Sequence, residues 1–157
     1  MAVYQIIREQ KIPSSLEKVW DFIATPNNLQ KITPDSMGFQ ITSKNLPQKM
    51  YPGMIISYKV KPLAGIKTTW VTEITHVQDL SFFVDEQRVG PYKMWHHEHH
   101  LEQTEKGVLM RDIITYEPPL KFLGSIANVI IIKRKLNQIF NYRHKAIEEM
   151  FGKYPES

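Results

Sequence analysis

Residues 122–151 read FLGSIANVIIIKRKLNQIFNYRHKAIEEMF, the longest stretch that neither proline nor a cluster of turn residues interrupts. Its apolar residues recur at intervals of three and four, which is typical of an amphipathic helix. The expected apolar band consists of Ile126, Ile130, Leu136, Ile139, Phe140, Ile147 and Met150. At about 1.5 Å per residue, such a helix spans roughly 45 Å. Because no neighbouring helix of a small domain could cover that length, we expect a broad, curved sheet to pack against it.

One charged residue interrupts this apolar band. Arg143 lies four positions from both Ile139 and Ile147, so its side chain is predicted to point at the sheet rather than at water. Burying a charge without a partner is costly. We therefore expect Arg143 to find a polar partner inside the protein.

The chain before this helix is dominated by segments in which apolar and polar residues alternate. Such segments predict half-buried antiparallel strands. The expected strands are residues 3–10, 37–43, 54–61, 68–76, 81–89, 92–101 and 108–116. Two short helical segments are expected after the first strand, at residues 16–23 and 28–32. This order predicts an α+β fold in which about seven strands form one antiparallel sheet around the long helix.

Length and composition favour a single domain over residues 1–157, because a chain of which 42% is hydrophobic suits one core. The absence of cysteine excludes disulfides, thiolate metal sites and a cysteine nucleophile, and fits a reducing compartment. No signal peptide is evident, and the most apolar run, residues 126–132, is too short to cross a bilayer. We expect a cytoplasmic protein with no integral membrane segment, and the sequence leaves its oligomeric state open.

The net charge of +4 and the isoelectric point near 9.2 admit acidic partners. The basic residues are dispersed except for Lys133-Arg134-Lys135, and the aromatic residues lie within the alternating strands. This distribution is not typical of a nucleic-acid-binding surface, so we expect no nucleic-acid partner. The basic triplet is interpreted as a solvated helix face, with docking to an acidic protein or membrane as the less favoured alternative.

Strand alternation divides the histidine-rich segment 95–101 into two faces. His97 and His99 share a face with an aromatic and an aliphatic residue, whereas the opposite face is uniformly polar, so the first is expected to point inward. The same argument places Asp112 on the inward face of the following strand. The hairpin between the two strands brings Asp112 to the sheet surface that carries the histidines, opposite Arg143 on the helix. The sequence therefore predicts an internal polar cluster of these four residues.

Short segments along nearly the whole chain match one branch of a known superfamily. They are Ile12-Pro13, Val19-Trp20, Pro26-Asn27-Asn28-Leu29, Ile32-Thr33-Pro34, Gly53-Met54-Ile55-Ile56-Ser57-Tyr58, Gly65-Ile66, Trp70-Val71-Thr72-Glu73-Ile74, Phe83-Val84-Asp85-Glu86-Gln87, Gly90-Pro91-Tyr92, Trp95-His96-His97-Glu98-His99, Tyr116, Pro119-Leu120, Leu123-Gly124 and Phe140-Asn141-Tyr142-Arg143-His144. Together with the element order, they resemble the bacterial ligand-binding domains of the SRPBCC superfamily, whose relatives include START-like, coenzyme-Q-binding and polyketide-cyclase-like proteins. The resemblance implies a helix-grip (Bet v 1-like) fold with a cavity between sheet and helix for an apolar small molecule. Lys121, where relatives usually have glycine, departs from the pattern.

We expect this inner face to bind a small hydrophobic molecule such as a lipid, a quinone or a polyketide-like compound. Aromatic side chains would hold its body and a polar group would bond its carbonyl or hydroxyl. The expected binding residues are Tyr58, Trp70, Thr72, Phe83, Asp85, Gln87, Trp95, His97, His99, Met110, Asp112, Ile114, Ile139 and Arg143. The directions of Asp85 and Gln87 are left open because residues 82–84 are apolar on both faces. Equally, the polar cluster could serve only to satisfy itself.

An enzyme is the alternative. His97 or His99, oriented by Asp112, could act as a general base on an enolisable carbonyl while Arg143 stabilises the oxyanion, as the cyclase-like relatives suggest. No nucleophile elbow, phosphate loop or nucleotide fingerprint is present, so we expect no cofactor. The two histidines are spaced to chelate zinc, with Asp112 as a third ligand. Because a zinc site usually needs three or four ligands in fixed geometry, we favour a hydrogen-bonded pair and expect no metal.

Overall fold

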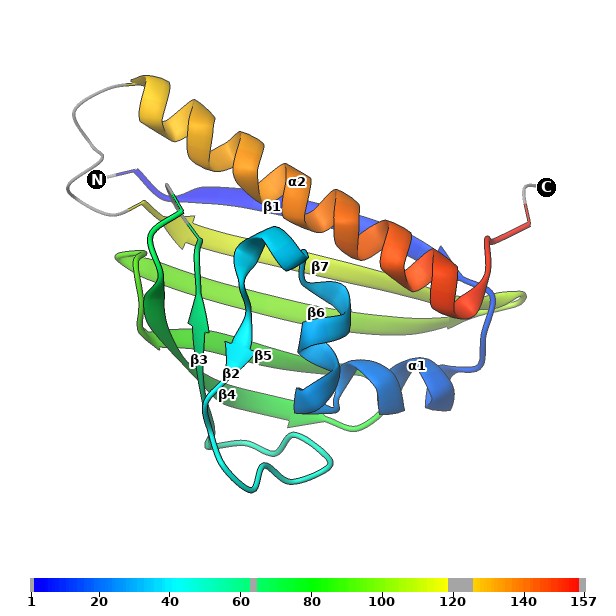
Figure 1. The fold of residues 1–157 in the computed structure, drawn as a ribbon. Helices are drawn as coiled ribbons and strands as arrows, with labels where there is room; N and C mark the ends of the chain where they lie inside the picture. The colour runs from blue at the N-terminus through cyan, green and yellow to red at the C-terminus, as the bar shows by residue number, and fades with distance from the viewer. Residues whose placement is uncertain (1, 63–64, 119–125, 156–157) are drawn as a thin grey trace.

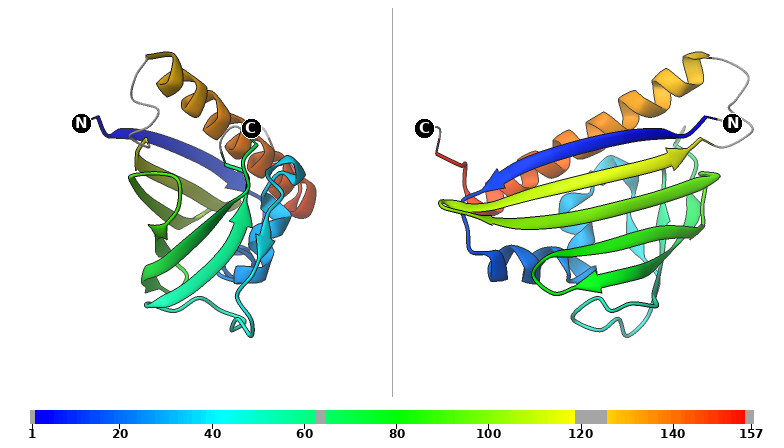
Figure 2. Two further views of the ribbon diagram at one scale, coloured as in Figure 1. Left: turned by 60° about the vertical axis from the view of Figure 1, so that its left-hand side comes forward. Right: turned by 180° about the vertical axis from the view of Figure 1, so that it is seen from behind.

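The structure, a computed structural model, describes residues 2–62, 65–118 and 126–155. Seven strands form one antiparallel sheet in the order β1-β7-β6-β5-β4-β3-β2. The strands are β1 (Tyr4–Ile12), β2 (Gln40–Ile41), β3 (Met54–Val60), β4 (Thr68–Gln78), β5 (Phe82–Val89), β6 (Met94–Thr104) and β7 (Gly107–Glu117). The helices are α1 (Leu16–Ile23), the 3-10 helices η1 (Pro26–Ile32) and η2 (Asp35–Met37), and α2 (Ile126–Phe151). All of these helices lie on the inner side of the curved sheet, and α2 runs along it (Figure 1; Figure 2).

The predicted seven-stranded sheet is confirmed, but one strand is much shorter than expected. The second strand, expected over residues 37–43, contains only Gln40 and Ile41. Met37 ends the 3-10 helix η2, and Gly38 follows with φ of 52°, in the left-handed region, so the chain turns before it joins the sheet. The helical turn expected at residues 28–32 is also 3-10 rather than α, and it begins at Pro26.

The predicted apolar band of α2 is correct in its middle and wrong towards its ends. The buried residues of α2 are Ile132, Leu136, Phe140, Arg143, Ala146 and Ile147. Ile130 and Met150 are 60% and 41% exposed. These buried side chains follow spacings of four, four, three, three and one, so the sheet covers only a narrow stripe and leaves adjacent apolar positions in solvent. The expected helix start at Phe122 and the loop at Lys121 lie outside the described residues, as does the side chain of Ile126.

Two hydrogen bonds between side chains of β1 and groups of α2 fix how the long helix lies on the sheet. Arg8 Nη2 donates to Asn137 Oδ1 at 2.6 Å, and Gln10 Nε2 donates to the His144 carbonyl at 2.9 Å. They lie on either side of Arg143 along the helix. Because both partners on β1 belong to the sheet, they help hold Arg143 towards the sheet's inner face.

Two clusters of buried apolar side chains lie between the sheet and the helices. The first includes Val19, Trp20, Phe83, Leu101, Met110 and Ile147. The second includes Trp70, Tyr92, Ile114, Tyr116, Ile132, Leu136 and Phe140. Along β7, Asp112 lies between Met110 of the first cluster and Ile114 of the second. Arg143 lies likewise on α2 between Phe140 and Ile147, so a polar layer separates the two cores.

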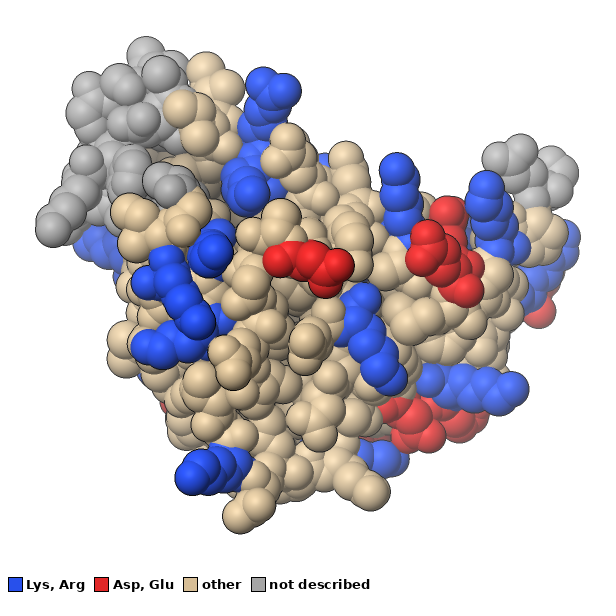
Figure 3. Space-filling view, in the orientation of Figure 1, with Lys and Arg blue, Asp and Glu red and all other residues tan. Residues whose placement is uncertain are grey.

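Among the described residues, basic and acidic side chains both lie on the face that α2 occupies (Figure 3). Figure 3 shows basic and acidic side chains scattered over this face rather than gathered at one place. Lys133 and Arg134 are exposed and Lys135 is half-buried. Within the part of the chain that the structure describes, no helix combines the length and the apolar character needed to span a membrane.

Candidate functional site

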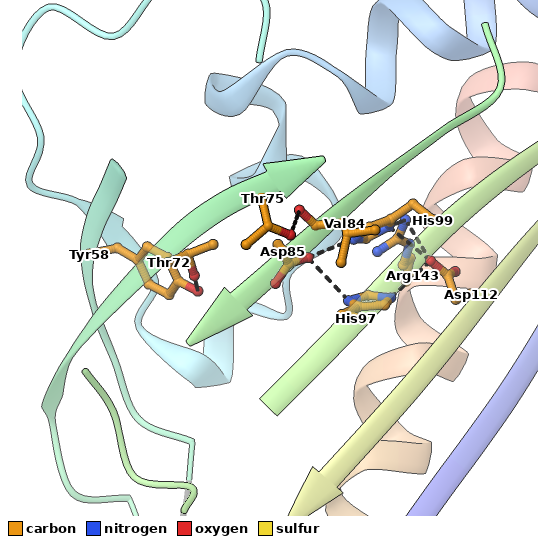
Figure 4. A network of polar contacts seen from close by, with 9 residues as sticks. All are labelled: Tyr58, Thr72, Thr75, Val84, Asp85, His97, His99, Asp112 and Arg143. Carbon is orange, nitrogen blue, oxygen red and sulfur yellow. Dashed lines mark hydrogen bonds and ion pairs between the residues drawn. The ribbon is translucent and has the colours of Figure 1, made fainter. Parts of the chain in front are cut away.

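The polar layer is assembled by cross-strand pairing. His99 on β6 lies directly opposite Asp112 on β7, and His97 lies directly opposite Asp85 on β5. Arg143 reaches the same place from α2 (Figure 4). The side chains of His97, His99, Asp112 and Arg143 are all buried, as the sequence predicts, and Asp85 is 16% exposed at its side chain. Strand periodicity therefore predicted that His97, His99 and Asp112 face inward. The register of β5 on β6 adds Asp85 to the cluster.

Asp112 is the common acceptor of the cluster. Its Oδ1 atom lies 3.0 Å from His97 Nε2, 3.0 Å from His99 Nδ1 and 3.3 Å from Arg143 Nη2. On the other side of the two rings, Asp85 Oδ2 lies 2.7 Å from His99 Nε2 and 3.5 Å from His97 Nδ1. Each histidine is thus held between two carboxylates, and the ring centroids are 3.7 Å apart.

The two histidines differ in protonation. Burial and the adjacent charge of His99 lower the pKa of His97 to about 4, against the effect of the carboxylates. Burial also opposes the charged form of His99, but its hydrogen bonds to Asp112 and Asp85 outweigh burial and raise its pKa. His97 is therefore uncharged at neutral pH, whereas the raised pKa of His99 favours its protonated form. Arg143 Nη2 lies 3.3 Å from His99 Nδ1 and donates to that nitrogen when the nitrogen carries no proton.

The carboxylates remain ionised although they are inside the protein. Burial alone would raise the pKa of Asp112, but Arg143 and the hydrogen bonds from the histidines hold it well below its usual value. Burial likewise opposes ionisation of Asp85, and the hydrogen bond from His99 does most to lower its pKa. When His99 is protonated and His97 is neutral, the two positive charges of His99 and Arg143 balance the two carboxylates, which limits the cost of burying the layer.

A cavity of about 150 Å³ lies beside this layer, bounded by β3 to β6, the 3-10 helices and α2. Its wall is strongly aromatic. Tyr58 stacks on Trp70 with ring centroids 6.1 Å apart, and Trp95 meets the same indole edge to face at 5.4 Å. The Trp70 Nε1 atom is buried and has no hydrogen-bond partner among the described residues, and the same holds for Arg143 Nε. Two of the residues that line this largely aromatic cavity thus each carry a buried donor that nothing in the described chain accepts.

Ten of the residues expected to bind a ligand line this cavity. They are Tyr58, Trp70, Thr72, Phe83, Asp85, Trp95, His97, His99, Ile139 and Arg143. Gln87 does not, because its amide bonds both the carbonyl and the N–H of Tyr92 and closes the connection between β5 and β6. Met110 and Ile114 are buried in the two apolar cores, and Asp112 lies behind the histidine rings.

Other residues that line the cavity are not among the binding residues predicted from the sequence. They include Leu29, Ile32, Met37, Phe39, Met50, Tyr92, Leu136 and Phe140. Most come from 3-10 helices and connections, where no strand or helix period says which way a side chain points. Tyr92 precedes β6, yet it is 5% exposed and packs 5.0 Å from Trp95. The sequence predicted Tyr92 as the first residue of a strand over residues 92–101, but β6 begins at Met94, so strand alternation does not apply to Tyr92.

The geometry changes the predicted chemistry of the histidines. The third potential metal ligand is Asp85 and not Asp112, since donor atoms of Asp85, His97 and His99 all lie within 4.8 Å of one another. For the general-base alternative the arrangement is less suitable. The pKa of His97 falls to about 4, which makes it a weak base, the raised pKa of His99 favours its protonated form, and Arg143 Nη2 is paired with Asp112.

Comparison with known proteins gives matches at the level of structure. No protein-family model and no curated protein matches the chain. It is similar to protein CV1439 from Chromobacterium violaceum, with 14% identity, 97% of this chain and 99% of that chain covered and a TM-score of 0.69. It is also similar to Ara h 8.0201, with 15% identity, 94% and 99% coverage and a TM-score of 0.59.

A third similar structure is the di-domain ARO/CYC StfQ from the steffimycin biosynthetic pathway. The identity is 9%, the TM-score is 0.71, and the match covers 95% of this chain and 51% of that one. The three similarities confirm the helix-grip, Bet v 1-like fold that the sequence predicts. Identities this low show the fold alone, so function must be argued from the site.

Proposed function

We propose that this protein binds a small apolar molecule, with an aromatic ring or similar flat body and one acceptor oxygen, in the cavity between the sheet and α2. The observation that carries this proposal is Trp70 Nε1, a buried donor without a partner among the described residues, in a wall of aromatic rings. A buried donor left unpaired costs about 1–3 kcal/mol. A carbonyl or hydroxyl oxygen of a ligand would remove that cost.

The size of the cavity favours a compact ligand over a long lipid chain. A cavity of about 150 Å³ is enough for a molecule of roughly the size of benzene. A single-ring quinone, phenol or cyclic ketone has the matching size and an acceptor oxygen. Quinones and polyketide-like rings, two of the ligand classes expected from the sequence, belong to this chemical class.

The test is a ligand titration followed by tryptophan fluorescence and by ligand-observed NMR. The probes are p-benzoquinone, phenol and cyclohexanone, with benzene as the analogue that has no acceptor. Trp70→Phe keeps most of the ring and loses the N–H group. It should weaken binding of the oxygen-bearing probes about 2- to 10-fold, the usual worth of one hydrogen bond, and leave benzene unaffected.

Two further variants separate the contribution of the Trp70 hydrogen bond to ligand binding from that of the cavity's volume. Trp95→Phe removes an indole from the same cavity but not the unpartnered donor, so it should leave the preference for oxygen-bearing probes intact. Ile139→Phe adds bulk at the cavity wall and should weaken the binding of all probes to a similar extent. If none of the probes binds the wild-type protein at millimolar concentration, or if Trp70→Phe affects benzene as much as phenol, the proposal is wrong.

A further inference from the structure

Both histidines of the polar layer present one ring nitrogen to each of two carboxylates, and the two sides are not equivalent. On one side, His97 Nε2 and His99 Nδ1 each lie 3.0 Å from Asp112 Oδ1. On the other, His97 Nδ1 and His99 Nε2 face Asp85 Oδ2 at 3.5 and 2.7 Å. Asp85 and both histidines line the cavity, whereas Asp112 does not. Two imidazole nitrogens and a carboxylate oxygen thus converge at the cavity wall.

We propose that Asp85, His97 and His99 bind a divalent transition-metal ion of the zinc class. In a tetrahedral zinc site with ligands at about 2.0–2.1 Å, two donor atoms lie roughly 3.3 Å apart. The separations of 2.7 and 3.5 Å lie on either side of this value, and all three donors fall within 4.8 Å of one another. An ion therefore fits after small side-chain adjustments, with His97 Nδ1, His99 Nε2 and Asp85 Oδ2 as its ligands.

The groups behind the histidines are those that a metal site requires. A histidine ligand usually donates its other ring N–H to a carboxylate or carbonyl, which fixes the tautomer and the ring orientation. Asp112 is placed to accept from both histidines at once, and Arg143 Nη2 holds Asp112 at 3.3 Å. The backbone registers His97 with Asp85 and His99 with Asp112, so the arrangement is built into the sheet.

The ligand set and its surroundings also indicate which ion and which further ligand would bind. Imidazole nitrogen suits Zn²⁺ and related ions, while Ca²⁺ and Mg²⁺ prefer oxygen ligands. Three protein ligands leave at least one coordination position, and all three of these residues line the cavity, from which a further ligand could reach the ion. With both histidines neutral, the ion, Arg143 and two carboxylates carry one net positive charge. Hydroxide or an anionic oxygen of a small molecule would neutralise it. The site does not depend on the proposed apolar ligand.

The test is a titration of chelator-stripped, full-length protein with Co²⁺ and Zn²⁺ alone. One equivalent of Co²⁺ per chain should bind and give visible absorption bands, and Zn²⁺ should displace it. Asp85→Asn and His99→Ala should abolish the stoichiometric binding. Asp112→Asn keeps all three ligands and should weaken binding about 10- to 100-fold, as the loss of an orienting carboxylate does in other sites.

The outer face of the same strand supplies the matched control. His96 and His100 lie beside Glu98 at the surface and could hold ions adventitiously. The double variant His96→Ala/His100→Ala should retain the bound equivalent. ¹⁵N NMR of the wild-type imidazoles gives a readout without substitution, since Zn²⁺ should shift the signals of His97 and His99. The proposal is overturned if wild-type protein binds no stoichiometric ion, or if the double variant rather than Asp85→Asn loses it.

Discussion

Asp112 holds the buried polar layer together, because three donors depend on its one carboxylate. His97, His99 and Arg143 all lie within 3.3 Å of its Oδ1 atom. Removing the carboxylate would leave the Arg143 guanidinium, and His99 when it is protonated, inside the protein with only Asp85 to balance them. The layer would then carry an uncompensated charge between two apolar cores.

Asp112→Ala should therefore destabilise the protein by about 3–5 kcal/mol, the usual cost of breaking a buried ion pair by removing one partner. Urea denaturation followed by tryptophan fluorescence measures the change in the free energy of unfolding. Glu98→Ala, on the outer face of the neighbouring strand, is the control, and it should cost less than about 1 kcal/mol because its ion pairs are exposed. Equal losses in the two variants would mean that the layer contributes no more than a surface pair.

At the scale of elements, α2 shows which buried positions of a helix the spacing of apolar residues can predict and which it cannot. The spacing of apolar residues in residues 122–151 correctly predicts a long helix with Leu136, Phe140 and Ile147 inward. Among the three consecutive isoleucines 130–132 it selected Ile130, which is wrong, because all three are equally apolar and spacing alone cannot rank them. The sheet selects Ile132, which is 2% exposed, and leaves Ile130 and Ile131 at 60% and 61%.

This difference in exposure predicts a large loss of stability for one isoleucine-to-alanine substitution and almost none for the same substitution at the adjacent position. Ile132→Ala should lower the free energy of unfolding by about 2–5 kcal/mol, since it opens a cavity in the second core. Ile131→Ala should change it by no more than about 0.5 kcal/mol, as is usual for exposed positions. Thermal and urea denaturation of both variants check the prediction. A larger loss for Ile131→Ala would show that α2 is rotated from the orientation described here.

Strand periodicity succeeded where a strand pairs on both sides. The alternation of β6 and β7 correctly placed His97, His99 and Asp112 inside, because neighbouring strands force every second side chain to the same face. It failed at residues 37–43, where Gly38 turns the chain, and it left Asp85 open. The register of β5 on β6 decided the direction of Asp85.

At the scale of the whole molecule, the stability of the fold depends on a neutral balance of charge in its interior. The polar layer lies between the two cores, so a proton gained or lost there acts on the packing of both. The two histidines respond to pH with opposite sign, because burial dominates for His97 while the carboxylates dominate for His99.

The metal-free protein should therefore be most stable near the ordinary histidine pKa of 6.5 as far as this pair is concerned. The pKa of His97 falls to about 4 in the folded state, so between pH 6.5 and 4 the unfolded state binds protons more readily and stability is lost on acidification. The pKa of His99 is raised, so its contribution is complete below pH 6.5 and is lost as pH rises through its folded value.

Urea denaturation across this range, in a buffer with chelator, measures the effect. His97→Gln keeps a polar side chain and cannot titrate, so its acid-side loss of stability should be smaller than that of the wild type by on the order of 3 kcal/mol. The comparison cancels the contributions of the other carboxylates. Parallel profiles for wild type and variant would show that His97 titrates normally in the folded protein.

The sequence by itself determined the fold class, the long helix, most strands and the inward faces of β6 and β7, because these follow from local period and from the need to bury apolar side chains. It also indicated that Arg143 needs an internal partner. Only the tertiary structure decided that Asp85 joins the histidines, that Gln87 does not, and that Tyr92 and the 3-10 helices line the cavity. Those features depend on strand register and on the packing of irregular segments, which bring together residues far apart in the chain and leave no periodic trace in it.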